Sequence, residues 1–472
     1  MIYSASFLTD YDFISALYIV AFTLFIVGMR QLTKPSTARR GNMIAAVGMA
    51  FAVAGALLTP STGDYGLIAL GVLIGTVIGV PAARQVKMTA MPQMVALFNG
   101  VGGGAVALIS WAEYRHSLEL GVGNPALETL IPILFAAIIG SISFWGSNVA
   151  FGKLQEIIPG RPIGVPGQQF VNLALLLVAV GAAVAIAAGA ESQGLFILIL
   201  VAAAILGNMV VLPIGGADMP VVISLLNALT GLSAAAAGIA LDNTALIVGG
   251  IIVGASGSIL TKLMAEAMNR SIPNIVAGGF GGGGGAAASS AAGEGQTARS
   301  TDASDVAVQL AYATRVVVAP GYGMAVAQAQ HTVRELADEL EKRGVEVLYA
   351  IHPVAGRMPG HMNVLLAEAD VPYDALKEMD EINPEFPQTD VTLVIGANDV
   401  TNPAAREDKG SPIYGMPILD VDKSAQVIVL KRSMNTGFAG IDNPLFYNDN
   451  TSLLFGDAKA SVGAVLSEVK EL

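Results

Sequence analysis

Hydrophobic residues in the first part of the chain form nine long runs, which short polar segments separate. Each run is close to the roughly 20 residues that a helix needs to cross the hydrocarbon core of a bilayer. The runs cover residues 13–29, 43–58, 65–83, 91–111, 129–151, 171–190, 195–213, 219–241 and 245–267. We therefore predict a polytopic α-helical membrane domain with nine spans.

The pattern changes after about residue 305, where short apolar runs alternate with segments of helical spacing. We predict strands at 315–319, 345–351, 391–395, 425–430 and 452–455, and helices near 324–343, 361–369, 373–379 and 458–469. This alternation is typical of an α/β Rossmann-like domain with a doubly wound parallel sheet.

A segment rich in Gly, Ala and Ser joins the two parts and predicts a flexible linker. The expected organisation is a membrane domain at 1–276, a linker at 277–304 and a soluble domain at 305–472.

Charge is distributed unevenly between the two parts. Residues 1–280 hold 11 Lys+Arg and 11 Asp+Glu, which leaves 14 basic and 26 acidic residues and a net charge of −12 for the rest. An acidic soluble domain argues against a nucleic-acid partner. Cysteine is absent, which excludes a thiolate metal site and a cysteine nucleophile, and we expect no metal.

The polar segments between the predicted spans carry most of their cations on one side. Those cations are Arg30, Lys34, Arg39, Arg40, Arg84, Lys87, Lys153, Arg161, Lys262 and Arg270, whereas the other side has Arg115. Because cytoplasmic segments of membrane proteins are enriched in Lys and Arg, the soluble domain is predicted to be cytoplasmic.

Small residues recur on one face of two predicted spans, which allows helix backbones to approach closely. They are Gly250, Gly254, Gly257 and Thr261 in the ninth span and Gly140, Ser143 and Ser147 in the fifth. A packed helix bundle follows from this pattern.

Polar groups within such a bundle are candidates for a proton path. Ser224, Asn227 and Gly231 share a face of the eighth span, and Asn99 lies in the fourth. Ordinary hydrogen bonding between helices is the alternative for each of them. Asp218 precedes the eighth span, where a helix N-cap is favoured over proton transfer.

No predicted span contains a histidine, because His116 lies beyond the fourth. A titrating group on a proton path would therefore belong largely to another subunit.

The strongest chemical motif lies where the soluble domain begins. A β-branched strand at 316–318 is followed by Gly321-x-Gly323-x-x-Val326 and then by a helical pattern. This order of strand, glycine turn and helix suits a dinucleotide pyrophosphate, which backbone N–H groups can approach closely. A plain strand-to-helix connection is the alternative.

Two features favour NADP over NAD. An NAD site usually has a carboxylate at the end of the second strand, but this strand ends at His352 without one. Lys431, Arg432 and Ser433 follow a later strand and offer two cations and a hydroxyl that suit a phosphate. We expect His352 and His361 to be structural.

Six motifs together resemble the β subunits of proton-translocating NAD(P) transhydrogenases over the whole chain. They are Gly215-Gly-Ala-Asp-Met-Pro220, Pro320-Gly-Tyr-Gly-Met-Ala-Val-Ala-Gln-Ala-Gln330, His352-Pro-Val-Ala-Gly-Arg357, Val394-Ile-Gly-Ala-Asn-Asp399, Lys431-Arg-Ser-Met-Asn-Thr-Gly437 and Phe455-Gly-Asp-Ala-Lys-Ala-Ser461. The resemblance implies a subunit of the cell inner membrane that binds NADP(H), with lipid around its spans. It also implies an α partner with an NAD(H)-binding domain and further membrane helices, and an α/β assembly that dimerises. The implied reaction is hydride transfer from NADH to NADP+, driven by protons entering the cytoplasm.

The resemblance also assigns residues, with the dinucleotide bound in the reverse of the usual Rossmann orientation. Asp399 is implied as the acid that senses the nicotinamide redox state, and Asn99 stands where some members carry a histidine. The implied cofactor-binding residues are Gly321, Tyr322, Gly323, Val326, Val354, Ala355, Gly356, Arg357, Met358, Pro359, Gly396, Ala397, Asn398, Asp399, Val400, Lys431, Arg432, Ser433, Met434, Asn435, Thr436, Gly437, Phe438, Asp457 and Ala458. A multispan transporter with a regulatory NADP-sensing domain is the alternative function.

Overall fold

The structure is a computed structural model that describes residues 10–268, 272 and 298–472, apart from gaps at 61–62, 88–89, 122, 160–162, 216–217, 358–359, 412 and 438. The chain divides into two compact units near the end of its ninth long helix. We call helices α1–α9 the membrane unit and residues 298–472 the sheet domain. Residues 277–297 of the predicted linker lie outside the described residues.

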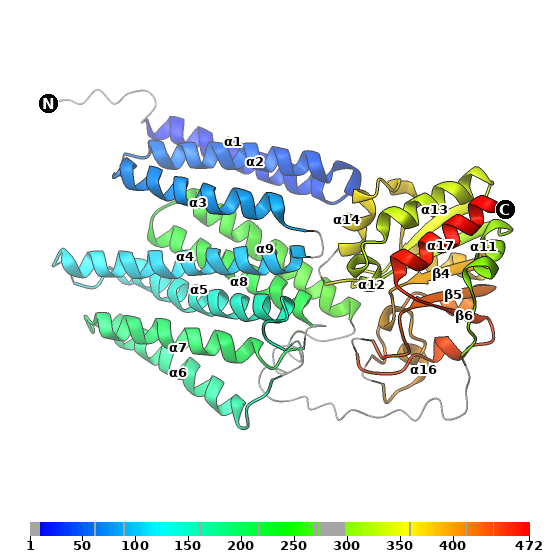
Figure 1. The fold of residues 1–472 in the computed structure, drawn as a ribbon. Coiled ribbons are helices and arrows are strands. Elements are labelled where there is room, and N and C mark those ends of the chain that lie inside the picture. Colours follow the sequence, from blue (N-terminus) through cyan, green and yellow to red (C-terminus); the bar gives the residue numbers. More distant parts are fainter. Residues whose placement is uncertain are drawn as a thin grey trace. The chain divides into compact units, whose positions relative to one another are not determined.

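The membrane unit consists of long apolar helices (Figure 1). Their bounds are α1 Tyr11–Leu32, α2 Pro35–Leu58, α3 Tyr65–Gln85, α4 Met91–Glu119, α5 Leu127–Leu154, α6 Gln168–Ala187, α7 Gln193–Val211, α8 Met219–Ala240 and α9 Thr244–Ala267. Within the described ranges, nine helices are long and apolar enough to span a bilayer, which confirms the predicted number. However, α4 continues past the predicted span, so His116 lies in its last turn rather than beyond it.

Glycines mark the contacts between these helices. A Cβ atom built on Gly103 of α4 would lie 2.9 Å from the carbonyl oxygen of Gly140 on α5. One on Gly231 of α8 would lie 2.5 Å from the backbone nitrogen of Gly254 on α9. No larger residue fits such contacts without moving a helix, so the predicted close packing through small residues is confirmed.

The sheet domain contains a parallel sheet whose strands follow the order β3-β2-β1-β4-β5-β6. The strands are β1 Arg315–Pro320, β2 Glu346–Ile351, β3 Leu376–Glu378, β4 Val391–Ile395, β5 Gln426–Lys431 and β6 Thr451–Phe455. Consecutive strands run outward from β1 in one direction and from β4 in the other, so the predicted doubly wound topology is confirmed.

Two sequence-based predictions in this domain were wrong. The helix predicted at 373–379 is a 3₁₀ turn, η3 (Tyr373–Ala375), followed by strand β3, because Leu376 to Glu378 pair with the end of β2. The helix predicted at 324–343 is interrupted at Gln328, whose φ is 50°. It forms a short α12 (Tyr322–Val326) and a longer α13 (Gln330–Lys342).

Helices cover one face of the sheet, where α17 (Ala458–Glu471) contacts both α11 (Ala303–Ala311) and α13. In Figure 1 they lie together around the labels α11, α13 and α17. The sequence analysis missed α11. Just before it, residues 299–301 pair with β6, since Thr301 donates to the Leu453 carbonyl at 3.0 Å.

The other face is covered by short segments that contribute large apolar side chains. These segments include α15 (Met379–Ile382), η4 (Asn383–Gln388), η6 (Val421–Lys423) and η7 (Pro444–Tyr447). Phe386, Leu419 and Phe446 pack there with sheet residues such as Val317 and Val429. Because alternate strand residues point to opposite faces, both faces of β1, β4 and β5 are buried, and the loops at their carboxyl ends are held on a rigid base.

Candidate functional site

The glycine turn after β1 contacts the loop after β4, where the strand order of the sheet reverses. The Gly321 N–H donates to the Ile395 carbonyl at 2.9 Å, and the Gly323 N–H donates to the Gly396 carbonyl at 3.0 Å. A Cβ atom on Gly321 would lie 2.3 Å from the Gly396 carbonyl oxygen, and one on Gly323 would lie 2.7 Å from the Gly396 Cα. Two loops of glycine backbone therefore meet at the position where doubly wound sheets bind ligands.

Replacing Gly396 by alanine should destabilise this contact strongly. Gly396 has a φ of +67°, and an added Cβ would lie 2.4 Å from the Gly323 Cα. We expect a loss of about 2 to 4 kcal/mol, which combines the cost of left-handed backbone with overpacking. Gly344→Ala is a matched control, because Gly344 has a φ of +86° but nothing within 4 Å. It should lose only about 1 to 2 kcal/mol. Urea unfolding of the sheet domain measures both, and equal losses would contradict the steric argument.

The loop after β5 folds over the loop after β4. Ala439 donates its N–H to Asp399 Oδ2 at 2.9 Å. The Asn443 side-chain amide donates to both the carbonyl and Oδ1 of Asn398, at 3.1 and 3.0 Å. A Cβ on Gly437 would lie 2.5 Å from Asp399 Oδ1. The predicted residues Asn398, Asp399 and Gly437 are thus brought together, and Asn443, which the sequence analysis missed, binds Asn398.

The three residues predicted to bind a phosphate are presented differently. Lys431 is half-buried and folds back on its own loop, where Nζ donates to the Asn435 carbonyl at 3.1 Å and lies 3.9 Å from the centre of the Phe446 ring. Burial lowers the Lys431 pKa, and the nearby Asp442 and Asp399 oppose that shift. Arg432 and Ser433 are exposed. The end of β5 therefore presents one exposed cation, Arg432, and one half-buried cation, Lys431.

Asp457 has a structural role in addition to its predicted one. Its Oδ1 accepts the N–H groups of Lys459 and Ala460 at 3.1 and 3.2 Å and so caps α17. The adjacent Gly456 N–H donates to the Lys431 carbonyl at 2.9 Å, which joins the ends of β5 and β6. Asp457 and Ala458 consequently lie next to the cationic loop.

The loop after β2 approaches the glycine turn through side chains. The Arg357 guanidinium lies 4.3 Å from the centre of the Tyr322 ring. Tyr322 also lies beside His361, with ring centroids 6.2 Å apart. Burial lowers the pKa of both His352 and His361 to about 4, and Arg357 contributes to the shift of His361. Both imidazoles are neutral at physiological pH.

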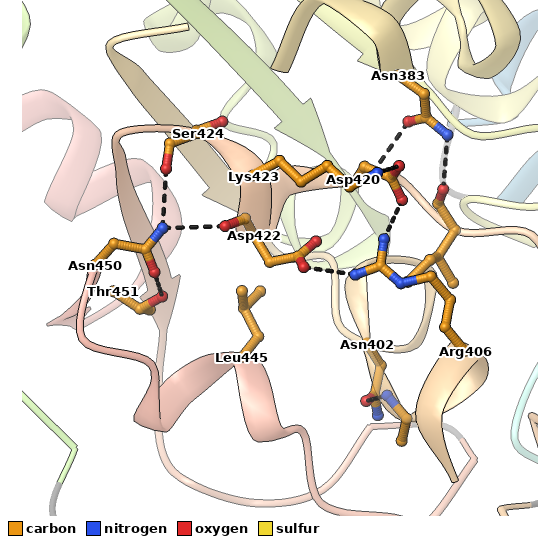
Figure 2. Close-up of polar contacts among 12 residues, drawn as sticks. Asn383, Asn402, Arg406, Asp420, Asp422, Lys423, Ser424, Leu445, Asn450 and Thr451 are labelled. Atoms are coloured by element: carbon orange, nitrogen blue, oxygen red, sulfur yellow. Dashed lines mark hydrogen bonds and ion pairs between the residues drawn. The ribbon is translucent and has the colours of Figure 1, made fainter. Parts of the chain in front are cut away.

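The long connection between β4 and β5 is fixed by charged side chains rather than by a crossover helix. Figure 2 shows Arg406 of α16 (Ala404–Glu407) reaching Asp420 and Asp422. The Asp422 contact is 2.5 Å, and Lys423 binds Asp420 at 2.5 Å. On the opposite side of the same picture, the Asn450 side chain donates to the Asp422 and Ser424 carbonyls at 3.1 and 2.9 Å. The ion pairs lie within the connection, and the Asn450 bonds attach its last residues to the segment that precedes β6.

Other predicted residues are less closely involved. The Val326 side chain is 47% exposed on α12 and takes part in none of the loop contacts above. Met358, Pro359 and Phe438 lie outside the described residues.

A surface cavity of about 470 Å³ lies at the opposite, amino edge of the sheet, and Arg315, Glu346 and Glu385 are among its lining residues. Arg315 forms ion pairs with both glutamates, so these charged side chains already have partners within the domain.

In the membrane unit, Asn99 faces α5. Its amide nitrogen donates to Ser147 Oγ at 2.9 Å and lies 3.4 Å from Ser143 Oγ. Ser143 continues the chain of hydrogen bonds to α8 through the Leu226 carbonyl, at 3.1 Å, and Thr230 Oγ1. Asn99 Oδ1 is buried without a hydrogen-bond partner in the part of the chain that the structure describes.

Ser224 and Gly231 instead face α9. Ser224 Oγ donates to the Gly257 carbonyl at 3.3 Å and accepts from Thr261 Oγ1 at 3.0 Å. The alternative of interhelical hydrogen bonding therefore describes Ser224 well. Asn227 is half-buried on α8. Asp218 is the N-cap residue of α8, as predicted, although its side chain makes no capping hydrogen bond.

Comparison with known proteins gives the family. A family model described as NAD(P) transhydrogenase beta subunit matches residues 14–468. Two curated relatives from Rhodospirillum rubrum, both described as NAD(P) transhydrogenase subunit beta, are each 50% identical over 447 residues, which cover 94% of this chain and 96% of the relative. A long helical membrane unit, a doubly wound sheet domain and these matches lead to one conclusion. The chain belongs to the NAD(P) transhydrogenase beta subunit family and is a component of that enzyme complex.

Proposed function

We propose that this chain is the proton-translocating membrane subunit that binds NADP(H), while an α partner binds NAD(H). The observation that carries the proposal is the contact of Gly321 and Gly323 with Gly396 at the reversal of strand order. Glycines at these positions let the loops after β1 and β4 pack closely at the strand ends where doubly wound sheets bind a dinucleotide. The cofactor supplies the hydride chemistry when it is bound, and the protein supplies position and electrostatics.

NADP rather than NAD is favoured by the charges at the strand ends. Arg432 and Ser433 are exposed next to Lys431, in a domain that is otherwise acidic. A guanidinium and a hydroxyl suit the 2′-phosphate that distinguishes the two cofactors. β2 ends at Ile351 without a carboxylate, and Glu378 ends the next strand outward. With the 2′-phosphate at β5, the nicotinamide end of the cofactor would extend toward β1 and β2, the reversed orientation.

Asp399 is proposed as the group that responds to the nicotinamide. Its Oδ2 accepts the Ala439 N–H, so it already connects the loop after β4 to the loop that covers it. A change of charge or hydrogen bonding at this carboxylate would alter how firmly the loop after β5 is bound. The redox state of a bound cofactor could in this way change the conformation of the loop after β5.

Proton passage is proposed to use the polar groups Asn99, Asp218, Ser224 and Asn227. Support comes from Asn99 Oδ1, which is buried and has no hydrogen-bond partner among the described residues, so that a water molecule or another donor could bind there. The distribution of Lys and Arg supports a cytoplasmic sheet domain, with this unit in the cell inner membrane. The direction of proton flow is then into the cytoplasm during reduction of NADP+ by NADH.

The division of labour gives a direct prediction. The sheet domain has one glycine turn of this kind, so residues 298–472 should bind one NADPH per chain. Alone they should not transfer hydride from NADH to NADP+. Equilibrium dialysis measures the first quantity, and reduction of a thio analogue of NADP+ measures the second. Rapid transfer by this domain without a partner would overturn the proposed dependence on the α subunit.

A further inference from the structure

Two buried imidazoles hold the loop between β2 and α14 (His361–Glu368). His352 Nδ1 accepts the Val354 N–H at 3.2 Å, and His361 Nδ1 accepts the Arg357 N–H at 3.1 Å. The side chains of both histidines are almost completely buried. The backbone N–H groups of Val354 and Arg357 are therefore each bound by a ring nitrogen that must be unprotonated.

The two histidines differ at their other nitrogen. His352 Nε2 lies 2.8 Å from the Pro417 carbonyl, to which it donates because its Nδ1 is an acceptor. The same reasoning puts a proton on His361 Nε2, yet that atom is buried without a partner among the residues that the structure describes. An unpaired buried donor is destabilising. A purely packing role would be filled better by an apolar side chain.

Gly356 shows what the imidazole of His361 is needed for. Its φ is +108°, and a Cβ at this position would lie 2.4 Å from His361 Nδ1. The absence of a side chain keeps the acceptor open to the next backbone N–H, that of Arg357. Arg357 in turn places its guanidinium over Tyr322, which lies within the glycine turn.

We propose that His361 is a positioning residue for NADP(H) binding, whose Nδ1 fixes the Arg357 backbone and so sets the guanidinium beside the glycine turn. This inference rests on the proposed function, since it takes the glycine turn to be the dinucleotide site. His361 itself does not touch the cofactor in this arrangement.

The test compares two substitutions in the full-length chain. His361→Asn retains an acceptor, because the asparagine Oδ1 can occupy the position of Nδ1, whereas His361→Leu removes it. We expect His361→Leu to weaken NADPH binding roughly tenfold, the effect of one lost hydrogen bond, and His361→Asn to restore most of the affinity. Limited trypsin digestion reports the loop directly, and cleavage after Arg357 should become faster in His361→Leu but not in His361→Asn.

Gly356→Ala provides a second route to the same result if His361→Leu does not fold. Its added Cβ would displace the acceptor, and it should also accelerate cleavage after Arg357. Unchanged cleavage and NADPH affinity in His361→Leu would overturn the inference, as would equal losses in the leucine and asparagine variants at equal thermal stability. If the wild-type chain binds no NADPH but the cleavage pattern is as expected, the proposed function fails while the role of His361 in the loop stands.

Discussion

Replacing Arg432 by alanine should weaken NADPH binding roughly ten- to hundredfold and leave NADH binding unchanged. A charge-assisted hydrogen bond to a phosphate contributes about 1.5 to 3 kcal/mol, and each 1.4 kcal/mol corresponds to about a tenfold change in affinity. Arg432 is exposed at the end of β5, so its loss should not disturb the fold. Calorimetry on residues 298–472 measures both affinities. This fragment includes residues 299–301, which pair with β6.

Two controls sharpen this result. Arg432→Lys keeps the charge but not the planar fork of donors, and should retain part of the preference for NADPH. Lys342→Ala removes an exposed cation from α13 that pairs with Glu339, and should change neither affinity. Equal losses for NADH and NADPH in Arg432→Ala would reject the assignment of Arg432 to the 2′-phosphate.

The second large effect is expected in the membrane unit, where Asn227→Leu should abolish proton-coupled transhydrogenation. Asn227 shares a face of α8 with Ser224 and Gly231, and a neutral amide can position water or a group from a partner without carrying charge. Leucine removes those hydrogen bonds and fills space that a water chain needs. Proton uptake into sealed vesicles with the α partner present measures coupling. The separate sheet domain does not contain residue 227, so its NADPH affinity cannot change and serves as the reference.

Asn208→Leu is the matched control, because Asn208 is also half-buried in a membrane helix but bonds within its own helix. Its side-chain nitrogen donates to the Ala204 carbonyl at 3.0 Å. This variant should keep proton pumping, and thermal stability in detergent should be measured for both proteins. A stable Asn227→Leu protein that pumps protons at the normal rate would show that this face is not the route.

The sequence predicted the architecture well where single segments carry enough information. Long apolar runs determine the membrane helices, and buried β-branched runs determine β1, β4 and β5. Strand β3 was missed because it is only three residues long, and its Leu376, Lys377 and Glu378 become a strand only by pairing with β2. The break at Gln328 was missed because neither glycine nor proline marks it.

The candidate site was predictable to the extent that its motifs follow strand ends. The glycines and the Lys431 to Ser433 sequence are local signals. The residues that hold the loops together are not, because their contacts join distant parts of the chain. Asn443 binds Asn398 from 45 residues away. His361 was expected to be structural, and nothing in its immediate sequence reveals that its ring accepts the Arg357 N–H.

Hydride transfer between two dinucleotides distinguishes a transhydrogenase subunit from a protein that only senses NADP. The full-length chain, loaded with NADPH, is mixed with a separate NAD(H)-binding α component and an analogue of NAD+ whose reduced form absorbs at a distinct wavelength. We expect the analogue to be reduced only when both proteins are present, and much more slowly when the chain carries Arg432→Ala at limiting NADPH. Binding of NADPH without any hydride transfer to the analogue would contradict it and would favour a domain that senses NADP without reacting with it.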